Sequence, residues 1–206
     1  FHGVSFEDIG RIRVFVLPLL LILLPVALVL RQPDLGTAIL LVLGGASVLF
    51  LAGMRLWKLG LAAAGVIGAV PVAWQFLRDY QKSRVLTFLD PGSDPLGAGY
   101  HILQSKIALG SGGVFGKGFM QGSQAHLNFL PEKQTDFIFT MLAEELGLVG
   151  ALGTLVLYLA IIFFGTIIAL RSHNQFGRLL ALGVVVTFFL YVFVNVGMVM
   201  GLMPVV

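Results

Sequence analysis

The sequence predicts an all-α integral membrane protein, a polytopic helical bundle, and three observations support this fold class. Of the 206 residues, 58% are hydrophobic and only 11% are charged, whereas soluble domains are about half apolar and a quarter charged. The apolar residues gather in stretches that reach the roughly 20 residues a helix needs to cross the hydrocarbon core. These stretches lack the period-two alternation of membrane-spanning strands, so the predicted spans are helices.

Composition also excludes several classes of function. The chain has no cysteine, which excludes a disulfide framework and thiol chemistry. Its net charge of +3 is small and its basic residues are scattered, so nucleic acid is not an expected partner. The first residues, "FHGVSFEDIGRIR", lack the apolar core of a signal peptide. Because the sequence starts without methionine and stops in the apolar "GLMPVV", we expect a fragment of a larger membrane protein.

Five stretches are long and apolar enough to span a membrane, and we expect them to form a single transmembrane domain. Pro18 and Pro25 lie in the first and Pro71 in the third, where neighbouring helices can satisfy the carbonyl groups that proline frees. We interpret these prolines and the many glycines as sites of helix bending and close helix packing. The predicted spans cover about residues 14–30, 36–54, 57–77, 146–170 and 179–203.

The basic residues of the short connections predict the orientation. Lysine and arginine are enriched in cytoplasmic connections, and here they gather before the first span, between the second and third, and between the fourth and fifth. The long connection 78–135 is therefore predicted to be periplasmic. The residues that carry this signal are Arg11, Arg13, Arg55, Lys58, Arg171 and Arg178.

The connection 78–135 is the candidate functional region because long ordered loops in compact proteins tend to be functional. It is apolar in patches, as in "YHILQSKIALG" and "AHLNFL". Ile102, Leu103, Lys106 and Ile107 fall at helical spacing, and Gly110 is a stop signal. We predict a short helix over about residues 100–109, lying on the membrane surface.

Two further patterns in this loop bear on ligand binding. "GSGGVFGKG" (residues 110–118) offers backbone amides and a lysine to a phosphate, but it lacks the Ser or Thr of a Walker loop. A turn without a ligand and a contact with phosphate or pyrophosphate both remain open. His101 and His126 have no second ligand at the spacing of a metal site.

Asp136 stands where the chain passes from the loop into an apolar helix. It could cap the helix, where the dipole favours an ionised carboxylate. The apolar "FIF" that follows would raise its pKa, and a carboxylate under these opposed influences suits a general base. The residues alone leave these two alternatives equal. For Glu144 and Glu145, further along the same helix, a structural ion pair is the favoured interpretation.

Three longer motifs resemble a known family. "RQPDLGTAIL", "DPGSDPLGAGYHILQSKIALGSGG" and "FLPEKQTDFIFTMLAEELGLVG" are similar to stretches of the SEDS proteins (shape, elongation, division and sporulation), in their elongation branch. The resemblance covers essentially the whole chain. It implies that the chain corresponds to the fifth to ninth of about ten spans. It also implies a peptidoglycan glycosyltransferase that polymerises lipid II at the outer face of the bacterial inner membrane.

The resemblance implies residue roles as well. Asp136 occupies the T-D-F position of the family's catalytic aspartate, as the base in a single inverting displacement that releases undecaprenyl pyrophosphate. Candidates for binding the diphosphate are Lys106, Lys117 and Arg84, and candidates for a supporting role are Glu144, Gln104 and Glu132. The chemistry leaves open a divalent cation, Mg²⁺ or Mn²⁺, beside the diphosphate.

The resemblance also implies partners, and two alternative functions stay open. Expected partners are lipid II and undecaprenyl-linked glycan, whose polyprenyl tails would lie in apolar grooves between the spans, together with membrane lipids, a class B penicillin-binding protein and the rod-elongation complex. Two alternatives from other classes are a lipid II flippase and a non-catalytic scaffold for a penicillin-binding protein. A transporter would place essential polar groups in broken helices near the middle of the membrane.

Overall fold

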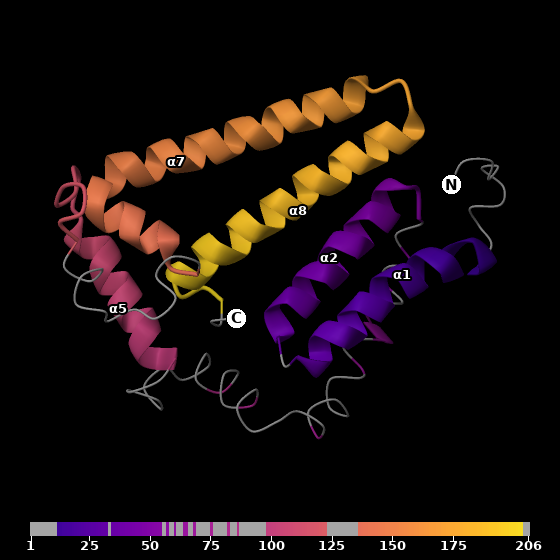
Figure 1. Cartoon of the computed structure of the whole chain (residues 1–206), viewed down its shortest axis with the longest axis horizontal. Helices are drawn as coiled ribbons and strands as arrows, with labels where there is room; N and C mark the ends of the chain where they lie inside the picture. The colour runs from indigo at the N-terminus through magenta and orange to yellow at the C-terminus, as the bar shows by residue number, and fades with distance from the viewer. Residues whose placement is uncertain are drawn as a thin grey trace. The chain divides into compact units, whose positions relative to one another are not determined.

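The computed structural model of the chain describes residues 12–32, 34–54, 98–122 and 136–203, together with isolated positions between 57 and 86. Within these residues every regular element is a helix and no strand occurs, which confirms the all-α prediction (Figure 1). The helices are α1 (Ile12–Arg31), α2 (Leu35–Leu51), α5 (Ala98–Ser111), α7 (Ile138–Arg171) and α8 (Gln175–Val199).

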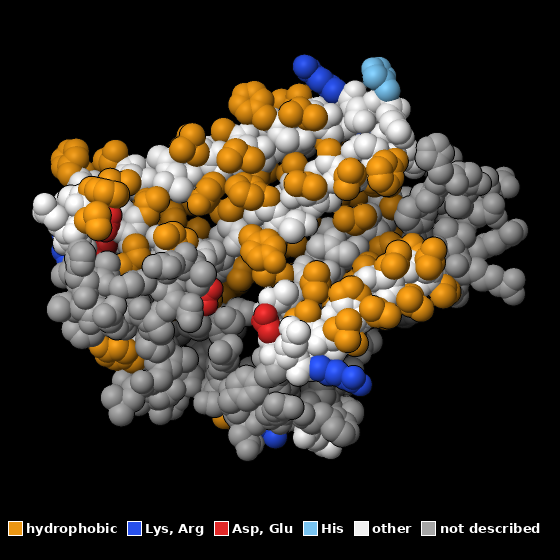
Figure 2. Space-filling model, in the orientation of Figure 1, with side chains coloured by type: hydrophobic (Ala, Val, Ile, Leu, Met, Phe, Trp, Pro, Cys, Tyr) orange, Lys and Arg blue, Asp and Glu red, His pale blue; other side chains and the backbone are white. Residues whose placement is uncertain are grey.

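Two of these helices are long and apolar enough to cross a membrane. They are α7 and α8, and α1 and α2 are shorter apolar helices. Only 11% of the most apolar window of α7 is buried and none of that of α8, so neither is the core helix of a soluble protein. Their large apolar side chains are exposed along the helices (Figure 2). A surface of this kind fits a lipid environment. The predicted span 57–77 lies almost wholly outside the described residues.

The first compact unit consists of residues 1–75 and 161–191, with Val206. In this unit Asp34 is the N-cap of α2. Its carboxylate accepts hydrogen bonds from the Thr37 backbone N–H (3.0 Å) and hydroxyl (2.6 Å). A Cβ on Gly45 would lie 2.7 Å from Ile22 of α1, so the glycine allows these helices to pack closely. Both Pro18 and Pro25 lie within the continuous α1.

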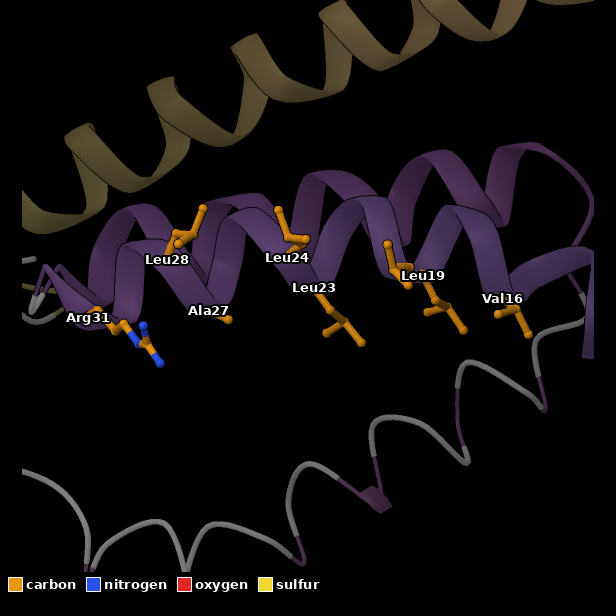
Figure 3. Close-up of a pocket in the computed structure, with 8 residues that line it drawn as sticks. Val16, Leu19, Leu23, Leu24, Ala27, Leu28 and Arg31 are labelled. Carbon is orange, nitrogen blue, oxygen red and sulfur yellow. The ribbon is translucent and has the colours of Figure 1, made fainter.

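One face of α1 carries apolar side chains at helical spacing, with Arg31 at its end (Figure 3). Leu20, Leu24 and Leu28 are all more than half exposed. On its other side, α1 forms with α2 and the first part of α8 an apolar groove of about 870 Å³. Its walls include Ile22, Leu41 and Phe188.

The second compact unit consists of residues 76–160 and 192–205. It contains α5, the first part of α7 and the last turns of α8. Its buried core lies around the start of α7, and Leu109 of α5, Leu155 of α7 and Val196 of α8 pack against it. The core residues are Phe137, Phe139, Met141, Ala143, Ala151 and Val199.

The bounds of the helices differ in places from those of the predicted segments. α7 begins at Ile138, close to Asp136, where the sequence predicts the entry into a helix, and it extends through the predicted span 146–170. α8 runs over Gln175–Val199 instead of 179–203. It starts after Asn174, whose side chain accepts the Phe176 N–H, and it ends in a Schellman turn with Gly201 at φ +71°. α5 is longer than predicted by two residues at each end.

Candidate functional site

The centre of the second unit is a break in α7 at Gly147. This residue has φ 69° and ψ −165°, a conformation that is essentially restricted to glycine. It divides α7 into a short segment, residues 138–146, and a long one, residues 148–171. A helix break leaves carbonyl groups unpaired on one side and N–H groups on the other. The neighbouring chain supplies partners for both.

The partner is the segment that follows α5, residues 112–118, which we call the docking loop. The N–H groups of Lys117 and Gly118 donate to the carbonyls of Glu144 and Glu145, each at 3.0 Å. In return, the N–H groups of Leu148 and Val149 donate to the loop carbonyls of Gly113 (2.9 Å) and Val114 (3.1 Å). The loop therefore supplies hydrogen-bond partners on both sides of the break, as buried backbone groups require.

Glycines make this backbone contact possible. A Cβ on Gly116 would overlap the carbonyl oxygen of Glu145, and one on Gly112 would overlap that of Ala143. Gly116 also has φ +80°, in the left-handed region. The glycine-rich run is thus a turn shaped to fit α7. Because the Lys117 and Gly118 amides donate to α7, they do not form a vacant cradle for phosphate.

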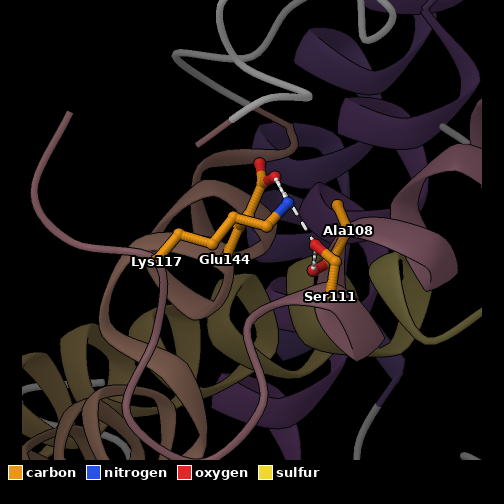
Figure 4. A network of polar contacts seen from close by, with 4 residues as sticks. All are labelled: Ala108, Ser111, Lys117 and Glu144. Carbon is orange, nitrogen blue, oxygen red and sulfur yellow. Dashed lines mark hydrogen bonds and ion pairs between the residues drawn. The ribbon is translucent and has the colours of Figure 1, made fainter. Parts of the chain in front are cut away.

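An ion pair fastens the same loop to the short segment of α7 (Figure 4). Lys117 Nζ lies 2.7 Å from Glu144 Oε1. Glu144 is completely buried, whereas 31% of the Lys117 side chain is exposed. Ser111 at the end of α5 donates to the Ala108 carbonyl (2.9 Å), and its Oγ is 3.5 Å from Glu144 Oε1. The expected ion pair is confirmed for Glu144. Its partner, Lys117, is one of the candidates for binding the diphosphate.

A buried polar link ties α5, α7 and α8 together. Ser105 Oγ donates to the Val199 carbonyl at 3.1 Å and lies 2.9 Å from Thr140 Oγ1. Since the Ser105 proton points to Val199, Thr140 is the donor to Ser105. Both hydroxyl side chains are completely buried. The link fixes the short segment of α7 against the end of α8.

Asp136 lies two residues before the first residue of α7 and is half-buried. Its backbone carbonyl accepts a hydrogen bond of 2.9 Å from the side-chain amide of Asn195 in α8. In Figure 1 the last turns of α8 lie beside the start of α7. Asp136 is thus held at the entrance of α7 by a neighbouring helix as well as by its own chain.

The other predicted site residues are only partly accounted for. Gln104 (half-buried) and Lys106 (exposed) lie on α5. Arg84 and Glu132 lie outside the described residues. Within the part of the chain that is described, no group of three or more His, Asp or Glu side chains could hold a metal ion. The structure therefore brings together Lys117 and Glu144, while the roles of the remaining candidates stay predictions.

The sequence did not point to Ser105 and Thr140, the two residues that link α5, α7 and α8. Ser105 and Thr140 carry no motif, and their signal is polarity within otherwise apolar helical stretches. Asn195 gives the same signal more clearly, since it interrupts the apolar "YVFVNVGMVM". The break at Gly147 has no distinct signal, because glycines are common in membrane helices.

Comparison with known proteins adds to this geometry. The family model FTSW_RODA_SPOVE, described as a cell cycle protein, matches residues 7–206. The peptidoglycan glycosyltransferase MrdB of Escherichia coli K12 is 56% identical over 189 residues, which are 91% of this chain and 51% of the relative. The peptidoglycan glycosyltransferase RodA of Treponema pallidum is 47% identical over 140 residues, which are 67% of this chain and 32% of the relative.

A further relative and a solved structure are also similar to this chain. A probable peptidoglycan glycosyltransferase FtsW of Aliivibrio salmonicida is 40% identical, over 98% of this chain and 50% of its own length. A solved structure, described as the structural coordination of polymerization and crosslinking by a peptidoglycan synthase complex, has a TM-score of 0.72 at 34% identity. The match covers 96% of this chain and 55% of that one. The chain thus spans about half the length of the first of these relatives.

Proposed function

This chain belongs to the FTSW_RODA_SPOVE family of cell cycle proteins, as its motifs predicted, and we propose that it is half of a peptidoglycan glycosyltransferase. The full protein polymerises lipid II into glycan strands at the outer face of the inner membrane during cell elongation. The observation that carries this proposal is Asp136, a half-buried carboxylate at the entrance of an apolar helix, whose peptide is held by a second helix. Relatives named peptidoglycan glycosyltransferases support it.

The proposed reaction needs one base. Asp136 accepts the proton of the 4-hydroxyl of the acceptor lipid II while that oxygen attacks the anomeric carbon of the growing chain. The new bond forms as the bond to undecaprenyl diphosphate breaks, and the single displacement converts the α-linked donor into a β-1,4 link. The departing diphosphate gains negative charge, which Lys106, Lys117 and Arg84 are candidates to stabilise. Lys117 would do so from a fixed position, since Glu144 holds it.

A divalent cation could assist the same leaving group by neutralising its charge. The described residues form no cluster of acidic or histidine ligands, and the diphosphate oxygens would themselves be ligands for such an ion. We therefore derive no step through a metal.

The membrane arrangement of the site is part of the proposal. We propose five spans with the connection 78–135 in the periplasm, which places Asp136 at the outer face, where lipid II is polymerised. The apolar groove among α1, α2 and α8 has the lining that a polyprenyl tail requires.

We also propose a partner. The similar solved structure is described as a complex that coordinates polymerization and crosslinking, and crosslinking is the reaction of a transpeptidase. This supports a class B penicillin-binding protein as the partner of the full protein, within the rod-elongation complex.

One observation favours a second function. The broken α7, with a buried carboxylate beside the break, is an arrangement that transporters also use. Translocation of lipid II by the full protein is therefore the second candidate. It predicts movement of labelled lipid II across vesicle membranes without the formation of glycan strands.

Asp136→Asn tests the proposed chemistry. Asparagine keeps the size of the side chain and can still cap a helix, but it cannot accept the proton. We expect the full-length variant to lose polymerisation on the order of a hundredfold or more while its thermal stability is retained. Asp136→Glu should also be badly impaired, because roughly 1 Å of displacement spoils the alignment.

The measurement is glycan-strand formation from purified lipid II, with variants matched for amount and folding. Near-parental polymer from Asp136→Asn would make Asp136 a cap and leave the flippase and the scaffold as the remaining functions. Translocation of labelled lipid II by the same preparations separates those two.

A further inference from the structure

Asn195 is a polar residue in a membrane helix that the proposed reaction does not use. It is half-buried near the end of α8, between the apolar neighbours Val194 and Val196. A polar side chain in such a helix needs a partner inside the protein. Its amide nitrogen donates to the backbone carbonyl of Asp136, which lies 59 positions away in the sequence.

Two polar contacts join α8 to the start of α7, and they follow helical spacing. Asn195 and Val199 are four residues apart on α8, and Asp136 and Thr140 are four apart at the start of α7. The first contact is direct, and the second runs through Ser105 of α5. The two contacts therefore fix the register of the two segments.

The two contacts act on different parts of the chain, one inside α7 and one just before it. Thr140 lies inside α7, where the second contact and the buried Phe139 and Met141 fix the packing. Asp136 lies before the first helical residue, so its orientation depends on the peptide groups that lead into α7. The Asn195 amide restrains one of these peptide groups from outside. Removing it should loosen Asp136 without dismantling the core.

We propose that Asn195 is a positioning residue, which fixes the peptide of Asp136 and thereby aims the carboxylate at the acceptor hydroxyl. This inference rests on the proposed function, because it assumes that Asp136 is the base. Asn195 acts through Asp136 and does not touch the substrate.

A general base misplaced by about 1 Å can lose on the order of a hundredfold in rate. Interhelical side-chain hydrogen bonds in membranes contribute little to stability on average. The bond should therefore matter far more to rate than to stability.

The test compares Asn195→Leu with Ser105→Ala in the full-length protein. Leucine keeps the branched shape of the asparagine side chain at a larger volume and removes the donor, while Ser105→Ala removes the other polar contact in the same packing and does not involve the Asp136 peptide. Asn195→Ala is a second variant in case leucine disturbs folding. The measurements are the maximal rate of glycan polymerisation, the lipid II concentration at half-maximal rate and the thermal stability.

We expect Asn195→Leu to lower the maximal rate about 10- to 100-fold and to change the half-maximal lipid II concentration by less than about twofold. Ser105→Ala should lose thermal stability and keep its maximal rate. Asn195→Gln, which retains a donor one methylene further out, should recover part of the lost rate. Parental rates in both Asn195→Leu and Asn195→Ala would overturn the inference, as would equal rate losses in Asn195→Leu and Ser105→Ala.

Asp136→Asn, assayed alongside, separates failure of the inference from failure of the proposed function. If Asp136→Asn is inactive and both Asn195 variants polymerise normally, the proposed function stands and the positioning role is wrong. If Asp136→Asn polymerises at the parental rate, the proposed base is wrong and the positioning role is overturned with it.

Discussion

At the scale of single residues, Lys117 pairs with the buried Glu144 and is also a candidate for binding the diphosphate. Glu144 is completely buried, and a buried carboxylate is strongly unfavourable without a partner. Lys117 supplies that partner from a loop whose backbone is bonded to the same turn of α7. A lysine in this position cannot move freely toward a substrate, so any contact with a diphosphate would use a cation that the fold has already oriented.

The first residue-scale prediction concerns this pair. Lys117→Ala removes the cation that pairs with the buried Glu144, and breaking a buried pair costs about 3–5 kcal/mol. We expect about 3 kcal/mol, the lower end, because part of Lys117 is exposed. The measurement is the loss of thermal stability in detergent. A Lys117→Ala variant as stable as the parent would contradict the structural role of the pair.

A double variant separates stability from substrate binding. Lys117→Met combined with Glu144→Leu removes both charges and should recover most of the lost stability, because apolar replacements of buried pairs are often neutral or better. Polymerisation is then compared at equal amounts of folded protein. If the stable double variant still uses lipid II poorly, Lys117 also serves the diphosphate. If it polymerises at the parental rate, the role of Lys117 is structural alone.

The sequence predicted these residues unevenly. Asp136 could be singled out because a carboxylate at the entrance to an apolar stretch is rare, and Glu144 could be expected to pair for the same reason. The partner of Glu144 could not be predicted, because it is 27 residues away and reaches Glu144 only through the turns of the docking loop. Asn195 could be noticed as polar, but its target is a backbone carbonyl that no sequence pattern marks.

At the scale of elements, the docking loop and the break in α7 form one structure. The apolar stretch predicted the long segment of α7, residues 148–171, nearly to its ends. The break itself was missed because its cause lies partly outside the helix. The loop provides the hydrogen bonds that make a bent α7 favourable, and its glycines allow the backbones to approach. Such a long-range requirement leaves no periodic signal in the sequence.

The element-scale prediction tests this fit with two alanine variants. Gly116→Ala puts a Cβ onto the Glu145 carbonyl at a positive φ, which should destabilise the protein by about 2 kcal/mol or more. Gly153→Ala is the matched control, because this helical glycine of α7 has open space around its Cβ. It should be neutral or stabilising by up to about 1 kcal/mol. Equal thermal stabilities of the two variants would show that the docking loop does not need its glycine.

At the scale of the whole molecule, the surface supports a membrane setting. The long segment of α7 and most of α8 expose leucine, isoleucine, valine and phenylalanine side chains, and Phe115 of the docking loop and the following Phe119 are exposed as well. Composition alone predicted the membrane class, since charge is scarce along the whole chain. The number of spans and their orientation depend on connections that lie largely outside the described residues, so they stay predictions.

The whole-molecule prediction concerns orientation, and two exposed positions test it. His173 lies in the short connection between α7 and α8, beside Arg171 and Arg178, which predicts a cytoplasmic location. Phe119 is 77% exposed directly after the docking loop, on the predicted periplasmic side. This part of the chain has no cysteine, so Phe119→Cys and His173→Cys can each carry a single label in a full-length protein made free of other cysteines. In intact spheroplasts, an impermeant thiol reagent should label Phe119→Cys, whereas His173→Cys should react only after the membrane is opened.

Labelling of His173→Cys alone would invert the orientation. It would also place Asp136 on the wrong side of the membrane for the proposed reaction, because α7 lies between Asp136 and His173.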